Sequence, residues 1–328
     1  MVEVKHWADL GDGAARSAPV SALDLEGALS ALAAHVANPQ VGLFGPDSMM
    51  WRISRESSIF LGSAPAIMLQ LAHPWVAAAI VDHSPVLSDP VGRFHRTFGI
   101  YHVMQFGTLD QALAAARRLY RRHAAVHGTM RETVGPFPAG SPYRANDADA
   151  LRWVHATLVD TGLRVYERVQ GPLPRPERDR YWAESRRLAA LFGLSPEDLP
   201  ADWDGFAAYV AAMHRSPVLT VGDDARAIIE GLFRHGRRWA RMPGWYAAVT
   251  ASLLPDRLRE GFGLAYGPRQ RAAADRVFAL TRATIPFLPD RLRYVGPYQE
   301  ARARLKGAER PDVGVRLANR FWIGRPAM

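Results

Sequence analysis

The chain has 328 residues, 48% hydrophobic and 22% charged, which is typical of a folded globular protein and unlike a disordered one. It contains no cysteine, which excludes disulfides, thiolate-bound metals, Cys-ligated haem or iron–sulfur clusters, and a cysteine nucleophile. The net charge of +9 comes almost entirely from arginine, since Lys5 and Lys306 are the only lysines. The arginines are spread along the chain without a recognised nucleic-acid-binding motif, so we expect no nucleic-acid partner.

The first twenty residues carry several charges and no apolar run. They predict a flexible leader over 1–20 and no secretory signal, and we therefore expect a cytoplasmic protein. Apolar residues at helical intervals, among them Leu25 and Leu29, predict a helix over 21–36.

Residues 57–81 contain no charged residue and are long enough to span a membrane. Pro65 and Pro74 would break such a span into short pieces. We interpret this stretch as two core segments with a break near Pro74, and membrane association is the less favoured alternative.

The next two predicted helices cover 93–106 and 109–126, separated by Gly107 and capped at Thr108. The second has an apolar stripe that includes Tyr120, His123 and Val126, with Arg122 on the opposite face. Gly128 is expected to end it.

Further helices are expected over 147–169, 178–192, 203–214, 223–233, 245–253, 269–283 and 297–305. Sustained polar–apolar alternation is almost absent, so we predict an all-α protein. Residues 170–177 (QGPLPRPE) form the one candidate boundary, and we prefer a single large helical domain over 21–310 with an irregular tail over 311–328.

Several common enzyme motifs are absent, including GxGxxG, GxxxxGK[ST], HExxH and GxSxG. The one Glu-x-x-His pair, Glu3 with His6, lies in the leader, so a ferritin-like di-iron site has no support.

His123 is the first candidate site residue. A neutral imidazole on an apolar helix face is suited to ligate haem iron, and neighbours such as Tyr120 suit a flat apolar cofactor. A core histidine bonded to a backbone carbonyl is the alternative from spacing alone. A two-histidine site with His127 lacks a carboxylate partner.

Arg93, Arg96 and Thr97 share one helix face, where guanidinium groups require an anion or other polar partner if they point inward. Haem propionates or a bound oxygen species would serve, whereas surface ion pairs are the alternative. His155 lies mid-stripe in its helix and His73 precedes Pro74, so each is a candidate pocket residue and each is also compatible with a satisfied core histidine.

The sequence resembles the DUF2236 family, which groups latex-clearing rubber oxygenases with MpaB-type oxygenases. The resemblance covers residues 42–270 and is carried by short segments in the family's order. These are GPDS at 45–48 followed by Trp51, QLAHP at 70–74, RFHRT at 93–97, RHAAVHG at 122–128, YRAND at 143–147 and WVHATLVD at 153–160.

The resemblance implies a globin-like helical core with one haem b, whose iron is ligated by His123. It also places Arg93, Arg96 and Thr97 on the opposite side of the haem, as catalytic residues, with Arg96 standing where latex-clearing proteins have lysine. A bulkier, permanently charged arginine is not equivalent to that lysine. We therefore expect a haem-dependent oxygenase or oxidoreductase that uses dioxygen on a small lipophilic or secondary-metabolite substrate, with an electron donor as a further candidate partner.

The rival hypothesis is a non-catalytic helical binding or membrane-associated protein whose histidines are structural. The two hypotheses differ in whether His123 and the Arg93–Arg96 face line one cavity wide enough for a porphyrin. A non-haem metal hydrolase would need acidic residues near His73, His123 and His127, and the spacing offers none.

Overall fold

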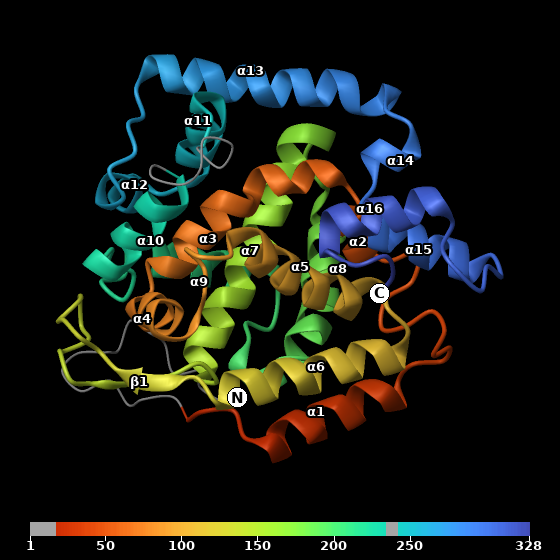
Figure 1. Ribbon diagram of the computed structural model, residues 1–328, viewed down its shortest axis with the longest axis horizontal. Helices are drawn as coiled ribbons and strands as arrows, with labels where there is room; N and C mark the ends of the chain where they lie inside the picture. Colours follow the sequence, from red (N-terminus) through yellow and green to blue (C-terminus); the bar gives the residue numbers. More distant parts are fainter. Residues whose placement is uncertain (1–17, 234–241) are drawn as a thin grey trace.

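Helix α7 (Ala148–Gln170) passes through the middle of the molecule, and the other elements pack around it (Figure 1). The computed structural model describes residues 18–233 and 242–328. The Asp147 carboxylate caps the helix by accepting hydrogen bonds from the backbone N–H groups of Asp149 and Ala150, both at 3.0 Å. The helix ends at Gly171, whose φ of 102° lies in the region that favours glycine.

The first half of the chain forms α1 (Ala22–Ala34), α2 (Met49–Ser54), η2 (Ser57–Gly62), α3 (Ser63–Leu71), α4 (Pro74–His83), α5 (Pro90–Phe106), α6 (Leu109–Ala124), β1 (His127–Thr129), β2 (Pro142–Arg144) and α7. The second half forms α8 (Arg175–Ala190), η3 (Pro196–Asp198), α9 (Trp203–Arg215), α10 (Asp223–Phe233), α11 (Gly244–Leu253), α12 (Asp256–Gly261), α13 (Pro268–Thr284), η5 (Ile285–Phe287), α14 (Asp290–Arg293), α15 (Gly296–Leu305) and α16 (Val313–Ile323). The all-α prediction is confirmed. The globin-like arrangement of the core stays a prediction.

The predicted end of α6 at Gly128 is wrong. The helix stops at Ala124, and His127 enters strand β1, which pairs antiparallel with β2 so that His127 lies opposite Arg144. The backbone N–H of Ala145 also donates to the carbonyl of Val126, at 3.0 Å. Pairing with a segment far along the chain therefore decides this boundary, and local propensity does not.

The predicted irregular tail over 311–328 is wrong for most of its length, because Val313–Ile323 forms α16. Asp312 caps this helix by accepting from the backbone N–H of Val315 at 2.9 Å, and Gly324 ends it at a φ of 72°. The buried residues Val315 and Ile323 lie on the face that packs against α5 and α15.

The candidate boundary over 170–177 is short, because α8 already begins at Arg175 and packs against α7. The predicted leader falls outside the described residues up to residue 17. Its end is held in place: Val20 is buried and its N–H donates to the carbonyl of Asn146 at 2.8 Å.

The uncharged stretch 57–81 forms η2, α3 and the first part of α4, with the predicted break at His73–Pro74. In the described part of the chain, no single helix is long and apolar enough to cross a membrane. Ser57–Leu71 and Pro74–His83 together have the required length and composition, but they are bent by 100° relative to each other.

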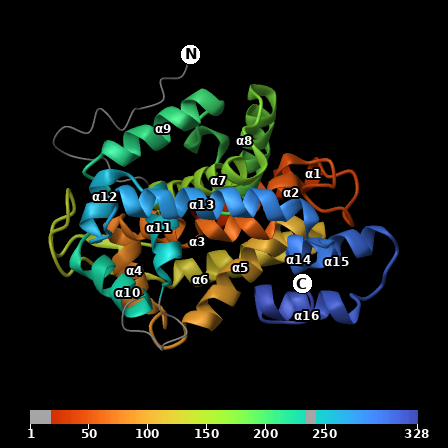
Figure 2. The ribbon, with the colours of Figure 1, turned by 90° about the horizontal axis from the view of Figure 1, so that it is seen from above.

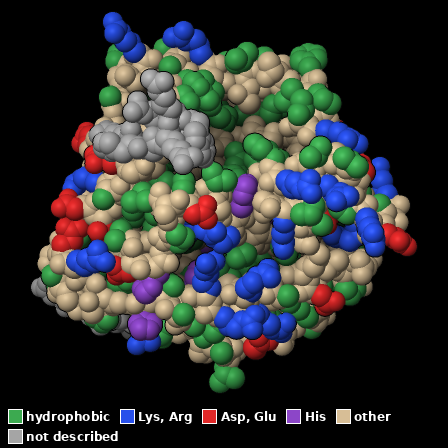
Figure 3. Space-filling model, viewed as in Figure 1, with side chains coloured by type: hydrophobic (Ala, Val, Ile, Leu, Met, Phe, Trp, Pro, Cys, Tyr) green, Lys and Arg blue, Asp and Glu red, His purple; other side chains and the backbone are tan. Residues whose placement is uncertain are grey.

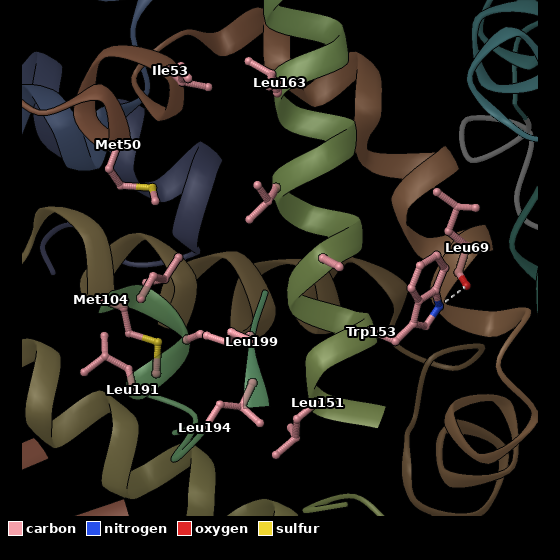
Figure 4. Packing of buried hydrophobic residues seen from close by; sticks show 14 of the residues in the cluster. Met50, Ile53, Leu69, Met104, Leu151, Trp153, Leu163, Leu191, Leu194 and Leu199 are labelled. Atoms are coloured by element: carbon pink, nitrogen blue, oxygen red, sulfur yellow. Dashed lines mark hydrogen bonds between the residues drawn. The ribbon is translucent and has the colours of Figure 1, made fainter. Parts of the chain in front are cut away.

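Large apolar side chains from α2, α3 and α7 form the centre of the core (Figure 4). Trp153 is 1% exposed and donates its indole N–H to the carbonyl of Leu69 at 2.9 Å. Trp51 donates in the same way to the carbonyl of Gln105 at 2.8 Å. Each such buried side chain contributes about 1.5–3 kcal/mol from apolar burial, while its polar atom remains bonded.

Helix α5 connects this core to the surface. It packs against α6 on one side and against α16 on another (Figure 2). Its first half, up to Phe98, is partly exposed, whereas Gly99 and His102–Phe106 are buried. A side chain's position along α5 therefore decides how deeply it lies in the protein.

Candidate functional site: an apolar cavity with a basic mouth

A cavity of about 610 Å³ lies among η2, α3, α4, α5, α6 and α7. This volume is in the range of sites for small molecules and cofactors. Most of its lining is aliphatic or aromatic, for example Ile67, Phe94, Phe98 and Leu158. The described lining residues include no aspartate or glutamate.

Four arginines stand at the outer part of this cavity: Arg93, Arg96, Arg122 and Arg144. We call them the basic mouth. Arg122 and Arg144 are exposed, and Figure 3 shows lysine and arginine side chains gathered on this face between α5 and α6. Four cations without a lining carboxylate favour an anionic group at this end of the cavity.

The two arginines of α5 have only some of the hydrogen-bond and charge partners that their guanidinium groups require. Arg93 donates from Nη1 to the hydroxyl oxygen of Ser84 at 2.8 Å, a neutral partner. Burial lowers the pKa of Arg93, and the nearby charges of Arg122 and Arg96 lower it further. Arg96 pairs through Nη1 with Asp89 at 3.0 Å, but its Nη2 is buried without a hydrogen bond to any described residue.

His123 lies near the C-terminal end of α6 and lines the same cavity. Burial lowers its pKa to about 4, and the charges of Arg93 and Arg122 lower it further. The imidazole is therefore neutral at physiological pH, which is the form that ligates a metal. The structure thus brings His123, Arg93, Arg96 and the exposed Thr97 to one cavity.

Three other predicted residues do not line it. His155 is buried beside Trp182 and Phe192, with ring centroids 6.3 and 6.2 Å away. His73 is buried at the N-terminal end of α4, beside Trp75 and Phe137.

Tyr120 packs, half-buried, against the core, and its neighbour Leu119 faces the cavity instead. One step around a helix is about 100°, so a small error in the predicted apolar stripe exchanges these two residues. Arg122 was predicted on the opposite face, yet it reaches the mouth because α6 ends there.

The sequence reasoning missed a polar group deeper in the cavity. His102 from α5, Thr161 from α7 and Tyr181 from α8 are all buried and all line the cavity. His102 lies on the same helix as Arg93, but nine residues are about two and a half helical turns, so the spacing alone places it on the opposite face. Thr161 and Tyr181 carried no sequence signal that separates them from ordinary core residues.

No group of three or more His, Asp or Glu side chains that could hold a metal ion occurs within 18–233 and 242–328. A porphyrin differs from such a site because it supplies four iron ligands itself and takes a single histidine from the protein.

The fold and the cavity define a class: an all-α protein that encloses a lipophilic ligand beneath a basic mouth. The family model described as "ER-bound oxygenase mpaB/B'/Rubber oxygenase, catalytic domain" matches residues 51–285. This is well over half of the chain, and the protein belongs to that family, so it carries an oxygenase catalytic domain. No curated protein and no solved structure is similar enough to the chain to count as a match.

Proposed function

We propose that this protein is a haem b-dependent oxygenase that uses dioxygen to oxidise a small lipophilic substrate. One observation carries the proposal: a neutral imidazole, His123, and four arginines share an apolar cavity whose described lining has no carboxylate. Family membership supports the oxygenase part. The haem and the substrate class rest on the residues.

The lining fits a haem at two independent points. His123 would hold the iron through a ring nitrogen, and its burial keeps that nitrogen unprotonated. Arg93, Arg96 and Arg122 would hold the propionates, and the buried, unbonded Nη2 of Arg96 is the kind of donor that a propionate satisfies. Haem b would supply a redox-active iron that activates dioxygen.

The remaining residues act on the substrate by shape and by exclusion of water. The rings of Phe60, Phe94 and Phe98 lie with centroids 4.4–5.7 Å apart and form an aromatic wall. Such a wall favours a flat or branched apolar molecule and keeps water away from the reacting carbon.

The same observation weighs against the rival hypothesis of purely structural histidines. A structural imidazole in a core accepts or donates a hydrogen bond. The His123 imidazole has no hydrogen-bond partner among the described residues; the same is true of the buried His155, but only His123 of the two faces the cavity.

The test is an absorption spectrum of the purified protein after supplementation with haem. We expect a Soret band in the wild-type protein and its loss or shift in His123→Ala. His155→Phe should keep the band, because His155 does not border the cavity. A wild-type protein that stays colourless with haem in excess would refute the haem assignment, and loss of the band only in His155→Phe would move the ligand there. In a coloured protein, the ratio of reductant to dioxygen consumed shows whether an electron donor takes part.

A further inference from the structure

Two buried polar atoms at the inner part of the cavity have no hydrogen-bond partner among the described residues. They are Nδ1 of His102 and Oγ1 of Thr161, which are 1% and 2% exposed as residues. Both residues line the cavity. An unsatisfied buried polar group costs about 1–3 kcal/mol. A ligand that supplies the missing hydrogen-bond partner would remove this cost and would therefore be bound more tightly.

His102 lies deeper in the protein than the basic mouth. His102 follows Arg93 by nine residues on α5, which corresponds to about 13 Å along a helix. Burial increases along the same path, from the partly exposed Arg93 to the fully buried His102. The cavity therefore has a charged outer end and an uncharged inner end.

His102 and Thr161 both lie beside η2. The Phe60 ring lies 6.0 Å from the His102 ring, and two residues later Gly62 lies against Thr161, where an added Cβ would be only 2.8 Å from the threonine methyl. At the next residue of α7, a Cβ added to Gly162 would lie 3.9 Å from the Tyr181 hydroxyl. We call His102, Thr161 and Tyr181 the inner polar group.

The inner polar group is neutral. Burial lowers the pKa of His102 to about 3, opposed by the nearby Phe98 carbonyl, and burial raises the pKa of Tyr181. A neutral imidazole and a hydroxyl both donate and accept hydrogen bonds. They match a ketone, alcohol or phenol oxygen. A carboxylate would instead be attracted to the arginines at the mouth.

We infer that the substrate is a largely apolar molecule with one neutral oxygen function, which His102 and Thr161 bind at the inner end of the cavity. This inference deepens the proposed oxygenase function and rests on it for the substrate's role. It excludes a pure hydrocarbon and a fatty acid as the preferred substrate. It also orients the molecule, because only one of its ends has a partner inside.

The experiment compares two ligands of nearly the same shape, 2-acetylnaphthalene and 2-isopropenylnaphthalene, in which a carbonyl oxygen is replaced by a methylene group. Free ligand is measured by its fluorescence after ultrafiltration of the full-length protein as purified. We expect the wild-type protein to bind the ketone about tenfold more tightly, the value of one net hydrogen bond. A protein that binds both ligands equally, prefers the hydrocarbon or binds neither overturns the inference.

Variants locate the preference. Thr161→Val keeps the shape of the side chain and removes the hydroxyl, and His102→Phe keeps a ring and removes both nitrogens. Each should reduce the ketone preference toward equal binding while leaving hydrocarbon binding within about twofold. Thr250→Val is the matched control, since Thr250 is also buried with an unbonded Oγ1 but does not line the cavity.

A ketone preference that survives both cavity variants also overturns the assignment, whatever its size in the wild-type protein. The readout needs no turnover and no Soret band. Failure of haem binding in the earlier test and failure of ketone selection here are therefore distinguishable.

Discussion

The two ends of the cavity use polar residues in different ways. At the basic mouth, Arg122 and Arg144 are exposed, so water solvates their charges when no ligand is present. At the inner end, His102 and Thr161 are buried and lack that option. Two of the four charged side chains are thus solvated, whereas the polar side chains of the inner end are neutral and buried. Changes at the inner end should therefore affect folding stability, and changes at the mouth should affect mainly ligand binding.

The largest expected effect is at a buried ion pair beside η2, outside the cavity lining. Glu56 is 1% exposed at the start of η2 and accepts hydrogen bonds from Nε and Nη2 of Arg293, both at 3.0 Å. Arg293→Met leaves a buried carboxylate with only the weaker contact to Arg55 at 3.5 Å. We expect a loss of about 3 kcal/mol in unfolding free energy, measured by urea denaturation. The double variant with Glu56→Leu should recover part of it, and no recovery would contradict this account.

The next effect concerns pH. Burial lowers the pKa of His155 to about 4, and neither of its ring nitrogens has a partner among the described residues. As the pH falls, His155 takes up its proton near pH 6.5 in the unfolded state but only near pH 4 in the folded state. The stability that the neutral His155 contributes to the folded state is therefore complete above pH 6.5 and is lost as the pH falls toward 4.

His155→Phe should therefore reduce the decline in unfolding free energy between pH 6.5 and pH 4.5 by about 1.4 kcal/mol per pH unit. Urea midpoints at four pH values measure this slope. An unchanged slope would mean that His155 is not desolvated as described.

Two glycines that border the cavity should respond in opposite ways. A Cβ at Gly62 would lie 2.8 Å from the Thr161 methyl, so Gly62→Ala should destabilise the protein by about 1–3 kcal/mol. A Cβ at Gly162 has only the Tyr181 hydroxyl within reach, at 3.9 Å. Gly162→Ala should therefore stabilise α7 by about 0.5–1 kcal/mol. Thermal melts of both variants measure the difference, and equal losses would refute the packing argument.

The smallest effect on stability is expected at the mouth. Arg122→Gln should change the unfolding free energy by less than about 0.5 kcal/mol, because the side chain is exposed. It should weaken haem binding by about two- to fivefold at low salt, and the loss should fade as salt increases. Arg118→Gln, on the same helix but away from the cavity lining, is the control. An equal effect of both substitutions would indicate only long-range charge.

Much of the helical framework was predictable. The sequence predicted the helix at 223–233 with the same bounds as α10, the Thr108 cap of α6 and the break before Pro74. These features depend on local chemistry: apolar periodicity, a side-chain oxygen that caps N–H groups, and the fixed geometry of proline. The end of α6 was not predictable in this way, because β2 supplies the partner of His127 from seventeen residues later.

The site residues also separate into those that the local sequence predicted and those that only packing between helices brought together. The residue types and spacing on one helix placed Arg93, Arg96 and Thr97 together, and the stripe on α6 placed His123 on an inward face. Which residues from different helices share the cavity was decided by packing alone. That is why His155 and His73 lie elsewhere, while His102, Thr161 and Arg122 line it.

By itself, the sequence determined the all-α class, the absence of thiol chemistry and the resemblance that family membership confirms. These follow from composition, from periodicity within single helices and from short motifs. Only the tertiary structure decided that the cavity is basic outside and neutral inside. That property depends on how deeply each helix end is buried, and burial depends on contacts between segments far apart in the chain.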